Sequence, residues 1–188
     1  ILLMKIKNIL IAGGGGELGL KLIDHLKNKG LKIFVLDRKF NKKIRHNNIK
    51  FIKLDFLNLK SSKKIPKNID VVYFLIGITG GPSSLDFKYL TKYIQMNCET
   101  LINFLRRIGN KKIKKIIFTS TEHVYNDNFS EKKDFLKKEP NPKNLYGVTK
   151  LLAEKILHNY FKKNSISIDV LRFPRVIIEK KNNLIAKM

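Results

Sequence analysis

A tyrosine and a lysine in the second half of the chain have the spacing needed to move a proton. Tyr146 and Lys150 lie four positions apart, which places both side chains on one face of a helix. A free phenol has a pKa of about 10 and is a poor base near neutrality, but a neighbouring ammonium group lowers that pKa. The pair is a weak signal by itself because the chain contains 33 lysines. Thr121, which ends an apolar run, adds a hydroxyl that strengthens the hypothesis.

A glycine-rich turn near the N-terminus is typical of phosphate binding. Gly13, Gly16 and Gly19 have the spacing G-x-x-G-x-x-G between an apolar run and an amphipathic segment. The first glycine permits a tight turn, the second lets backbone approach a pyrophosphate, and the third lets the helix pack closely. The helix that begins around Glu17 and Leu18 would then present free N–H groups to the phosphates.

Two features favour a dinucleotide as the ligand of this turn. A P-loop is excluded because Leu20-Lys21 stands where that motif requires Lys-Ser or Lys-Thr. Asp37 ends the next apolar run, 18 residues after Gly19, where a carboxylate can accept hydrogen bonds from both ribose hydroxyls. Its position favours NAD. Arg38 follows directly and could accommodate a 2′-phosphate, so NADP remains the less favoured alternative.

Short apolar runs alternate with amphipathic segments along the chain, as in a parallel sheet covered on both faces. The expected strands are 6–12, 32–36, 49–54, 71–76, 113–119 and 168–173, and the expected helices are 18–30, 84–108 and 145–161. This alternation predicts a doubly wound parallel α/β sheet of the Rossmann type, with strand order 3-2-1-4-5-6. We expect one such domain over residues 1–178.

The predicted topology brings the chemical groups together. Ligands of open α/β sheets bind at the carboxyl ends of the strands, and Thr121 follows the fifth expected strand directly. Tyr146, at the start of the next helix, would face the same crevice. The sequence therefore predicts a catalytic site beside a bound dinucleotide.

With these motifs in this order, the chain resembles the NAD-dependent epimerase/dehydratase family of extended short-chain dehydrogenases/reductases, which act on nucleotide sugars. The resemblance runs from Lys5 to about Val176 and includes the glycine turn, the acid after the second strand, and the Thr, Tyr and Lys of the catalytic site. Further matches lie where the family contacts NAD or supports the site: Asp55, Phe56, Leu75, Gly77, Asn97 and Phe173.

The resemblance implies hydride chemistry on a sugar hydroxyl. Tyr146 as a phenolate would remove the hydroxyl proton, Lys150 would lower the pKa of Tyr146 and bind the ribose, and Thr121 would hydrogen-bond the reacting oxygen. The keto sugar could then be epimerised, dehydrated or decarboxylated, and reduced again. Glu122 partly resembles the acid that assists dehydration in some branches, but His123 departs from that pattern. Epimerase and dehydratase activities therefore both stay open.

The end of the chain departs from the family. Members continue from the Leu-Arg-aromatic strand into a smaller domain that grips the nucleotide sugar, whereas residues 175–178 here replace the usual Tyr-Gly-Pro. We expect residues 179–188 to be a tail that begins a missing substrate domain, and the chain alone to bind dinucleotide without turning over sugar. A non-catalytic Rossmann binding protein and a reductase of a non-sugar carbonyl are the alternatives.

The composition bears on partners. The net charge is +24, from 39 Lys and Arg against 15 Asp and Glu, which invites a nucleic-acid interpretation. However, only 6 of the 39 cations are Arg, the usual reader of phosphates and guanines, and the lysines are spread along the whole chain. We therefore expect no nucleic-acid partner. No apolar stretch approaches the roughly 18 residues of a membrane helix, so we expect no membrane partner.

The remaining residue types predict a reduced protein without a metal site. The single cysteine, Cys98, can form no intrachain disulfide, so we expect it to be a buried apolar group in a cytoplasmic protein. His25, His46 and His158 lack ligand spacing and are expected on the surface. The family often dimerises through the two long helices, so a homodimer is expected if the exposed faces of 84–108 and 145–161 are apolar.

Overall fold

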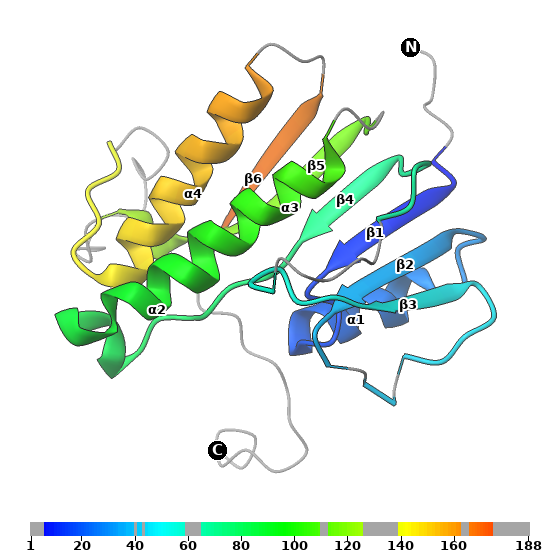
Figure 1. Ribbon diagram of the computed structural model, residues 1–188, viewed down its shortest axis with the longest axis horizontal. Coiled ribbons are helices and arrows are strands. Elements are labelled where there is room, and N and C mark those ends of the chain that lie inside the picture. Colours follow the sequence, from blue (N-terminus) through cyan, green and yellow to red (C-terminus); the bar gives the residue numbers. More distant parts are fainter. Residues whose placement is uncertain are drawn as a thin grey trace.

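One parallel sheet of six strands organises the molecule (Figure 1). The computed structural model describes residues 6–39, 41–42, 44–58, 65–109, 113–125, 139–162 and 166–174. The strand order is β3-β2-β1-β4-β5-β6, which confirms the predicted Rossmann topology. The strands are β1 (Asn8–Ala12), β2 (Lys32–Asp37), β3 (Ile49–Lys53), β4 (Val71–Phe74), β5 (Lys115–Thr121) and β6 (Ser167–Phe173). The expected tail, 179–188, lies outside the described residues.

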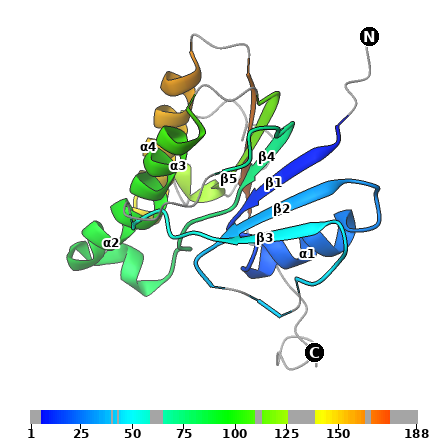
Figure 2. The ribbon, with the colours of Figure 1, turned by 45° about the vertical axis from the view of Figure 1, so that its right-hand side comes forward.

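Helices cover both faces of the sheet (Figures 1 and 2). Helix α1 (Glu17–Leu26) lies on one face, and α2 (Leu90–Ile94), α3 (Thr100–Ile108) and α4 (Leu145–Phe161) lie on the other. Alternate residues of β1 divide between two cores: Ile9 and Ile11 pack on the α1 side, and Leu10 and Ala12 pack on the side of α3 and α4. Burial on both faces explains why β1 is a continuous apolar run.

The long helix predicted over 84–108 is wrong at its start, because α-helix begins only at Leu90. The chain forms two 3₁₀ turns, η1 (Pro82–Leu85) and η2 (Phe87–Tyr89), then α2, a π-helical turn η3 (Gln95–Glu99) and α3. Asp86 interrupts the helix because its extended backbone and its side chain, which accepts from Lys88 N–H, cap η2. The π turn brings Asn97 and Cys98 together against α4, which helical spacing alone could not reveal.

Helix α4 begins and ends where the sequence predicts. Asn144 caps it, with its side-chain oxygen accepting from Gly147 N–H at 2.8 Å. The cap fixes the first turn of the helix, which carries Tyr146. Among the described residues, no helix combines the length and apolar character that a membrane crossing requires.

Gly19 allows α1 to lie against the glycine turn, because a Cβ at this position would approach Gly14 Cα to 2.5 Å. We expect Gly19→Ala to lower the free energy of unfolding by about 1–3 kcal/mol through this overpacking. Urea denaturation measures the change. Gly16→Ala is the matched control: the nearest atom to its Cβ would be Gly13 O at 3.5 Å, so its loss should stay under about 1 kcal/mol. Equal losses in the two variants would contradict the packing argument.

Candidate active site

The glycine turn forms an open cradle at the carboxyl end of β1. Gly13 has φ +84°, a conformation that favours glycine, and a Cβ there would press on Ile76 at 3.0 Å. Gly16 is the N-cap of α1, and no side chain caps the helix there. Because no side chain caps it, the first turn of α1 can direct its backbone N–H groups and the positive end of the helix dipole toward an anion. The turn thus has the form predicted for binding a pyrophosphate.

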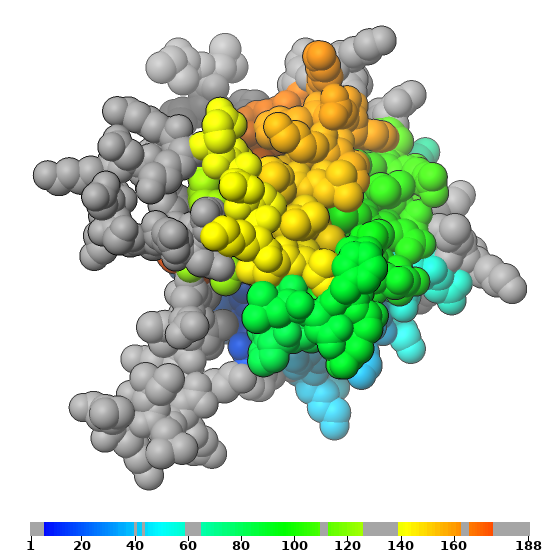
Figure 3. Space-filling model, turned by 90° about the vertical axis from the view of Figure 1, so that its left-hand side faces the viewer, coloured from blue at the N-terminus to red at the C-terminus, as the bar shows by residue number. Residues whose placement is uncertain are grey.

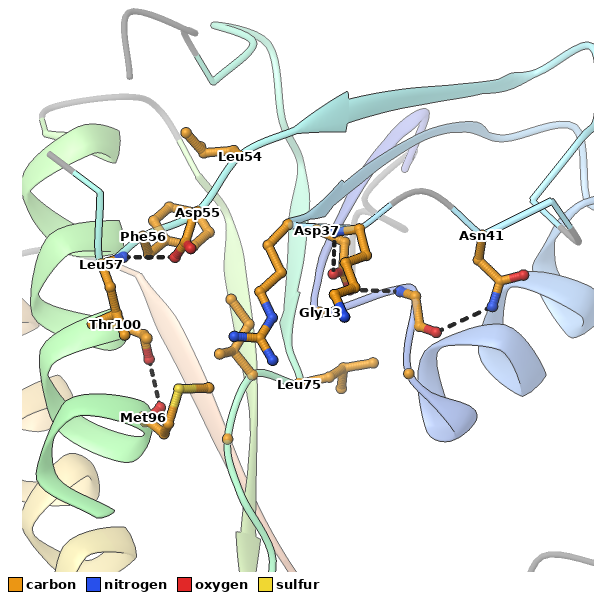
Figure 4. Close-up of a pocket in the computed structure, with 16 residues that line it drawn as sticks. Gly13, Asp37, Asn41, Leu54, Asp55, Phe56, Leu57, Leu75, Met96 and Thr100 are labelled. Carbon is orange, nitrogen blue, oxygen red and sulfur yellow. Dashed lines mark hydrogen bonds between the residues drawn. The ribbon is translucent and has the colours of Figure 1, made fainter. Parts of the chain in front are cut away.

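A cleft of about 500 Å³ opens beside this turn (Figure 4). The glycine turn with Asp37 and Asn41 lies on one side of it, and the segment after β3 with the helix residues Met96 and Thr100 lies on the other. Eight predicted cofactor residues line the cleft: Gly13, Gly16, Asp37, Arg38, Asp55, Phe56, Leu75 and Gly77. Residues with separate roles in the sequence analysis therefore share one cavity.

Asp37 joins the end of β2 to the glycine turn. Its Oδ2 accepts the Gly15 N–H at 2.8 Å, and its Oδ1 accepts the Lys39 N–H at 3.1 Å. A Cβ on Gly15 would lie 2.8 Å from the same carboxylate, so this glycine allows the close approach. Asn41 supports the turn from the outside by donating to Gly15 O at 3.4 Å. The carboxylate that was predicted to bind ribose thus also fixes the loop that would bind phosphate.

The far end of the cleft is built on the segment after β3. Asp55 Oδ1 accepts the Leu57 N–H at 3.0 Å, which shapes the turn. Phe56 is buried, and its ring packs edge-on against Phe104 with centroids 5.7 Å apart. Phe56 therefore supports the wall from the core.

Sequence reasoning missed half of the lining. The missed residues are Gly15, Lys39, Asn41, Leu54, Leu57, Ile76, Met96 and Thr100. Most are neighbours of predicted residues along the chain. Met96 and Thr100 come from a different element and are one helical turn apart, with the Thr100 hydroxyl donating to Met96 O at 2.7 Å. Their contribution follows from the packing of η3 and α3 beside β4, which the local pattern does not specify.

Seven other predicted cofactor residues do not line this cleft: Glu17, Leu18, Gly19, Asn97, Tyr146, Lys150 and Phe173. Asn97 is fully buried; its side-chain oxygen accepts Ile78 N–H at 2.9 Å, and its amide nitrogen donates to the Thr149 hydroxyl at 3.0 Å. It therefore connects the segment after β4 to helix α4. Phe173 ends β6 beside Thr121, with which it is paired in the sheet.

The three predicted catalytic side chains converge next to the cleft. Thr121 is the buried last residue of β5, and its hydroxyl lies close enough to the phenol of Tyr146 to lower the pKa of that group. Lys150 lies one turn further along α4 and is buried. Gly77, which lines the cleft, is the link: a Cβ on it would lie 3.7 Å from Lys150 Nζ. The structure thus brings the predicted trio to the edge of the predicted cofactor cleft.

The ring of Tyr146 lies close to the segment that follows β4. A Cβ on Gly80 would lie 3.0 Å from its ring, and the His123 ring centroid is 5.7 Å from the Tyr146 centroid. Burial raises the pKa of Tyr146, the Thr121 hydroxyl lowers it in part, and the nearby Tyr93 raises it further. The net pKa shift is upward. Desolvation outweighs the effect of Thr121, and Lys150 is not among the groups that shift this pKa, so the lowering expected from Lys150 stays a prediction.

The ammonium group of Lys150 lies inside the protein rather than in solvent. Its Nζ is 4.3 Å from the ring centroid of Phe118, a cation–π contact. Burial lowers the pKa of Lys150 to about 8, while Glu154 and Cys98 act in the opposite direction. A lysine with its pKa near neutrality can gain or lose a proton under ordinary conditions, which is a property of functional sites.

Two predictions about other residues are confirmed. Cys98 is buried, its thiol donates to Thr149 O at 3.2 Å, and burial raises its pKa to about 11, so it remains an uncharged packing group. His25, His46 and His158 are exposed. Within the described part of the chain, no cluster of three or more His, Cys, Asp or Glu side chains could hold a metal ion.

The sheet order and the glycine turn are those of a Rossmann-type α/β domain. Residues 9–187 match the NAD dependent epimerase/dehydratase family. The chain belongs to this family, whose members are enzymes.

Individual relatives and a solved structure match this chain over most of its length. The protein YtbQ of Bacillus subtilis is 29% identical over 95% of this chain and 71% of its own length. The dTDP-D-glucose 4,6-dehydratase of Dictyostelium discoideum is 29% identical over 96% of this chain and 48% of its own. A crystal structure of UDP-glucuronic acid 4-epimerase from Bacillus cereus, in complex with UDP-glucuronic acid and NAD, superposes with a TM-score of 0.75 at 30% identity. That match covers 88% of this chain and 55% of the epimerase, so the chain spans about half the length of the last two proteins.

The buried ammonium group predicts a pH-dependent stability. Lys150 has a pKa of about 8 when folded and an ordinary value of 10.5, so between these values the unfolded state holds a proton that the folded state has released. The free energy of unfolding should therefore rise with pH across this window, by on the order of 3 kcal/mol from this group. Lys150→Met cannot titrate and should lack the rise. Urea denaturation at about pH 7 and about pH 10 measures it.

The control for this experiment is Lys155→Met, which removes an exposed lysine from the same helix. This variant should retain the rise seen in the wild-type protein. If wild type and Lys150→Met changed in parallel with pH, the assignment of a titrating lysine to the core would be wrong.

Proposed function

We propose that this chain is the cofactor-binding part of an NAD-dependent nucleotide-sugar epimerase or dehydratase that acts by transient oxidation of a sugar hydroxyl. One observation carries the proposal: Thr121, Tyr146 and Lys150 meet at the edge of the cleft that the glycine turn and Asp37 form. Membership of the family supports the chemistry.

The residues that would hold NAD fit a dinucleotide. The uncapped N-terminus of α1 offers N–H groups to a pyrophosphate, and Gly16 leaves open space where a side chain would intrude. Asp37 offers carboxylate lone pairs to ribose hydroxyls, and Asp55 with Leu54 flanks the far end of the cleft. When bound, NAD supplies the acceptor for a hydride from the sugar carbon.

We infer a preference for NAD over NADP, because the carboxylate of Asp37 faces the cleft and would repel a 2′-phosphate. Arg38 and Lys39 line the same part of the cleft and soften that preference.

The proton chemistry falls to the chain's own residues. Tyr146 takes the proton of the substrate hydroxyl, and Thr121, whose hydroxyl lies near the phenol, orients the reacting oxygen. Lys150 stabilises the phenolate that this step needs and binds the ribose. Because burial raises the pKa of Tyr146, its phenolate form depends on positive charge close to the phenol.

A nucleotide sugar is the proposed substrate because the compared structures include UDP-sugar epimerases, one of them bound to UDP-glucuronic acid. A non-catalytic dinucleotide-binding protein and a reductase of a non-sugar carbonyl are the competing functions. The retained trio argues against the first. The single cysteine, buried and protonated, suits a reducing compartment such as the cytoplasm.

The test uses responses that the cofactor-binding half can give by itself. NAD should bind the wild-type chain in calorimetry, and Gly16→Ala should weaken binding at least about tenfold because its methyl group enters the phosphate cradle. NAD should also lower the pKa of Tyr146, since a nearby cation favours the phenolate. The ultraviolet absorbance of phenolate, wild type minus Tyr146→Phe, reports that pKa.

Tyr89→Phe, in the η2 turn, is the control and should keep the NAD-dependent phenolate signal. NAD binding without any change at Tyr146 would favour the non-catalytic binding protein. Absence of NAD binding at millimolar cofactor would overturn the proposal.

We also propose a homodimer, with the second copy on the face formed by η1, η2, α2 and α4. Apolar side chains are exposed there: Leu85, Phe87, Ile94, Val148 and Leu152. Figure 3 shows α4 beside the segment that contains α2 on this side of the molecule, and Val148 and Leu152 are one helical turn apart. These exposed apolar side chains support the homodimer that the sequence analysis expects.

Light scattering after size-exclusion chromatography tests the dimer. The wild-type protein should have twice the monomer mass, and Leu152→Glu should be monomeric because a charge is buried unpaired at the interface. Lys155→Glu, on an exposed position of the same helix, is the control for added negative charge and should stay dimeric. A monomeric wild type would contradict the proposal.

A further inference from the structure

A carboxylate lies inside the core, one helical turn after Lys150. Glu154 is on α4 and is only 4% exposed. A buried ionised carboxylate is costly unless paired and hydrogen-bonded, so its partners must compensate for the lost hydration. The proton chemistry proposed for Thr121, Tyr146 and Lys150 does not involve Glu154.

Glu154 binds the ends of two strands. Its Oε1 accepts a hydrogen bond from the Ser120 hydroxyl and another from Arg172 Nε at 3.2 Å, and its Oε2 accepts Arg172 Nη2 at 2.7 Å. The Arg172 guanidinium is itself held by Tyr125, through a hydrogen bond and a cation–π contact at 4.8 Å. The bidentate pair is geometrically specific and fixes the carboxylate between α4 and the sheet.

The position of these partners matters for the site. Ser120 and Arg172 are paired across β5 and β6, and the next pair along the two strands is Thr121 and Phe173. The carboxylate therefore accepts hydrogen bonds from the residue pair that directly precedes the proposed catalytic threonine.

A small set of charged and polar groups surrounds the ammonium group of Lys150. Glu154 is the negative group, one turn away on the same helix; Cys98 from η3 faces Lys150 as a neutral thiol; and Tyr146 lies one turn before it. Two cations, Lys150 and Arg172, share the single carboxylate, which leaves one positive charge in excess. A phenolate at Tyr146 would balance that excess.

We propose that Glu154 is a positioning residue for the reaction: its carboxylate holds Lys150 as a charged ammonium group beside Tyr146 and fixes the strand end that carries Thr121. This inference rests on the proposed function for its catalytic meaning. The effect of Glu154 on the charge of Lys150 can be measured without cofactor or substrate.

The experiment follows the titration of Lys150 by NMR of isotope-labelled lysine side chains, with Lys150→Met identifying the signal. Glu154→Gln removes the buried negative charge, so the pKa of Lys150 should fall from about 8 toward the range of about 5 to 6 that buried lysines can reach. Arg172→Met removes the competing cation and should raise the pKa of Lys150. Opposite shifts from two partners of one ion pair would not follow from a merely structural role.

Asp169→Asn is the matched control. It removes an acid from the same strand, where Asp169 Oδ2 pairs with Lys115 Nζ at 2.6 Å near the surface, and should leave the titration of Lys150 unchanged. Glu154→Asp keeps the charge and should restore most of the wild-type value.

The outcomes separate this inference from the proposed function. If Lys150 titrated at the same pH in wild type, Glu154→Gln and Arg172→Met, the positioning role would be overturned even with NAD binding intact. If Glu154→Gln did not fold, Arg172→Met and Glu154→Asp would still decide the direction of the shift. If the shifts appeared but NAD did not bind, the electrostatic inference would stand and the proposed function would fail.

Discussion

The site depends on a charged ammonium group kept inside an apolar core. Lys150 is buried between α4 and the sheet, against the ring of Phe118 on β5, where water cannot stabilise its charge. Such a group is tolerated only if other charges and dipoles replace its hydration. Glu154, one turn along α4, supplies the opposite charge, and Arg172 anchors that carboxylate to the sheet. The position of α4 relative to β5 and β6 thus determines whether this end of the sheet can carry out acid–base chemistry.

A second set of contacts places the cofactor cleft beside this charged core. The π turn η3 directs Asn97 into the space between the segment after β4 and helix α4, where its amide bonds Ile78 and Thr149. Gly77, which a side chain would push against Asn97, then lines the cleft and lies next to Lys150. One buried amide therefore couples the position of the cleft wall to that of helix α4. The π turn is a condition of this arrangement because it directs Asn97 toward both partners. Such turns often occur at functional sites.

The glycine turn shows how steric and polar constraints cooperate. Gly13 and Gly19 are required by the fold itself, one by its backbone conformation and the other by the close approach of α1 to Gly14. Gly16 is different, because the protein leaves open space around it, and its lack of a side chain serves whatever binds in the cleft. Asp37 then holds the turn through Gly15 N–H while presenting its carboxylate to the same cavity. Folding and binding therefore depend on different glycines of one motif.

The sequence by itself determined the sheet order, the six strands, helices α1 and α4, the glycine turn with Asp37, and the proposed trio of Thr121, Tyr146 and Lys150. These features are local, because periodicity, turn chemistry and i to i+4 spacing are written within a few residues of each other. Tertiary structure alone decided the contribution of Met96 and Thr100 to the cleft, and the burial that raises the pKa of Tyr146 and lowers that of Lys150. It also brought Glu154 to Ser120 and Arg172, which lie 34 and 18 residues away in the chain. Desolvation and long-range pairing depend on which elements pack together, and no short stretch of sequence records that.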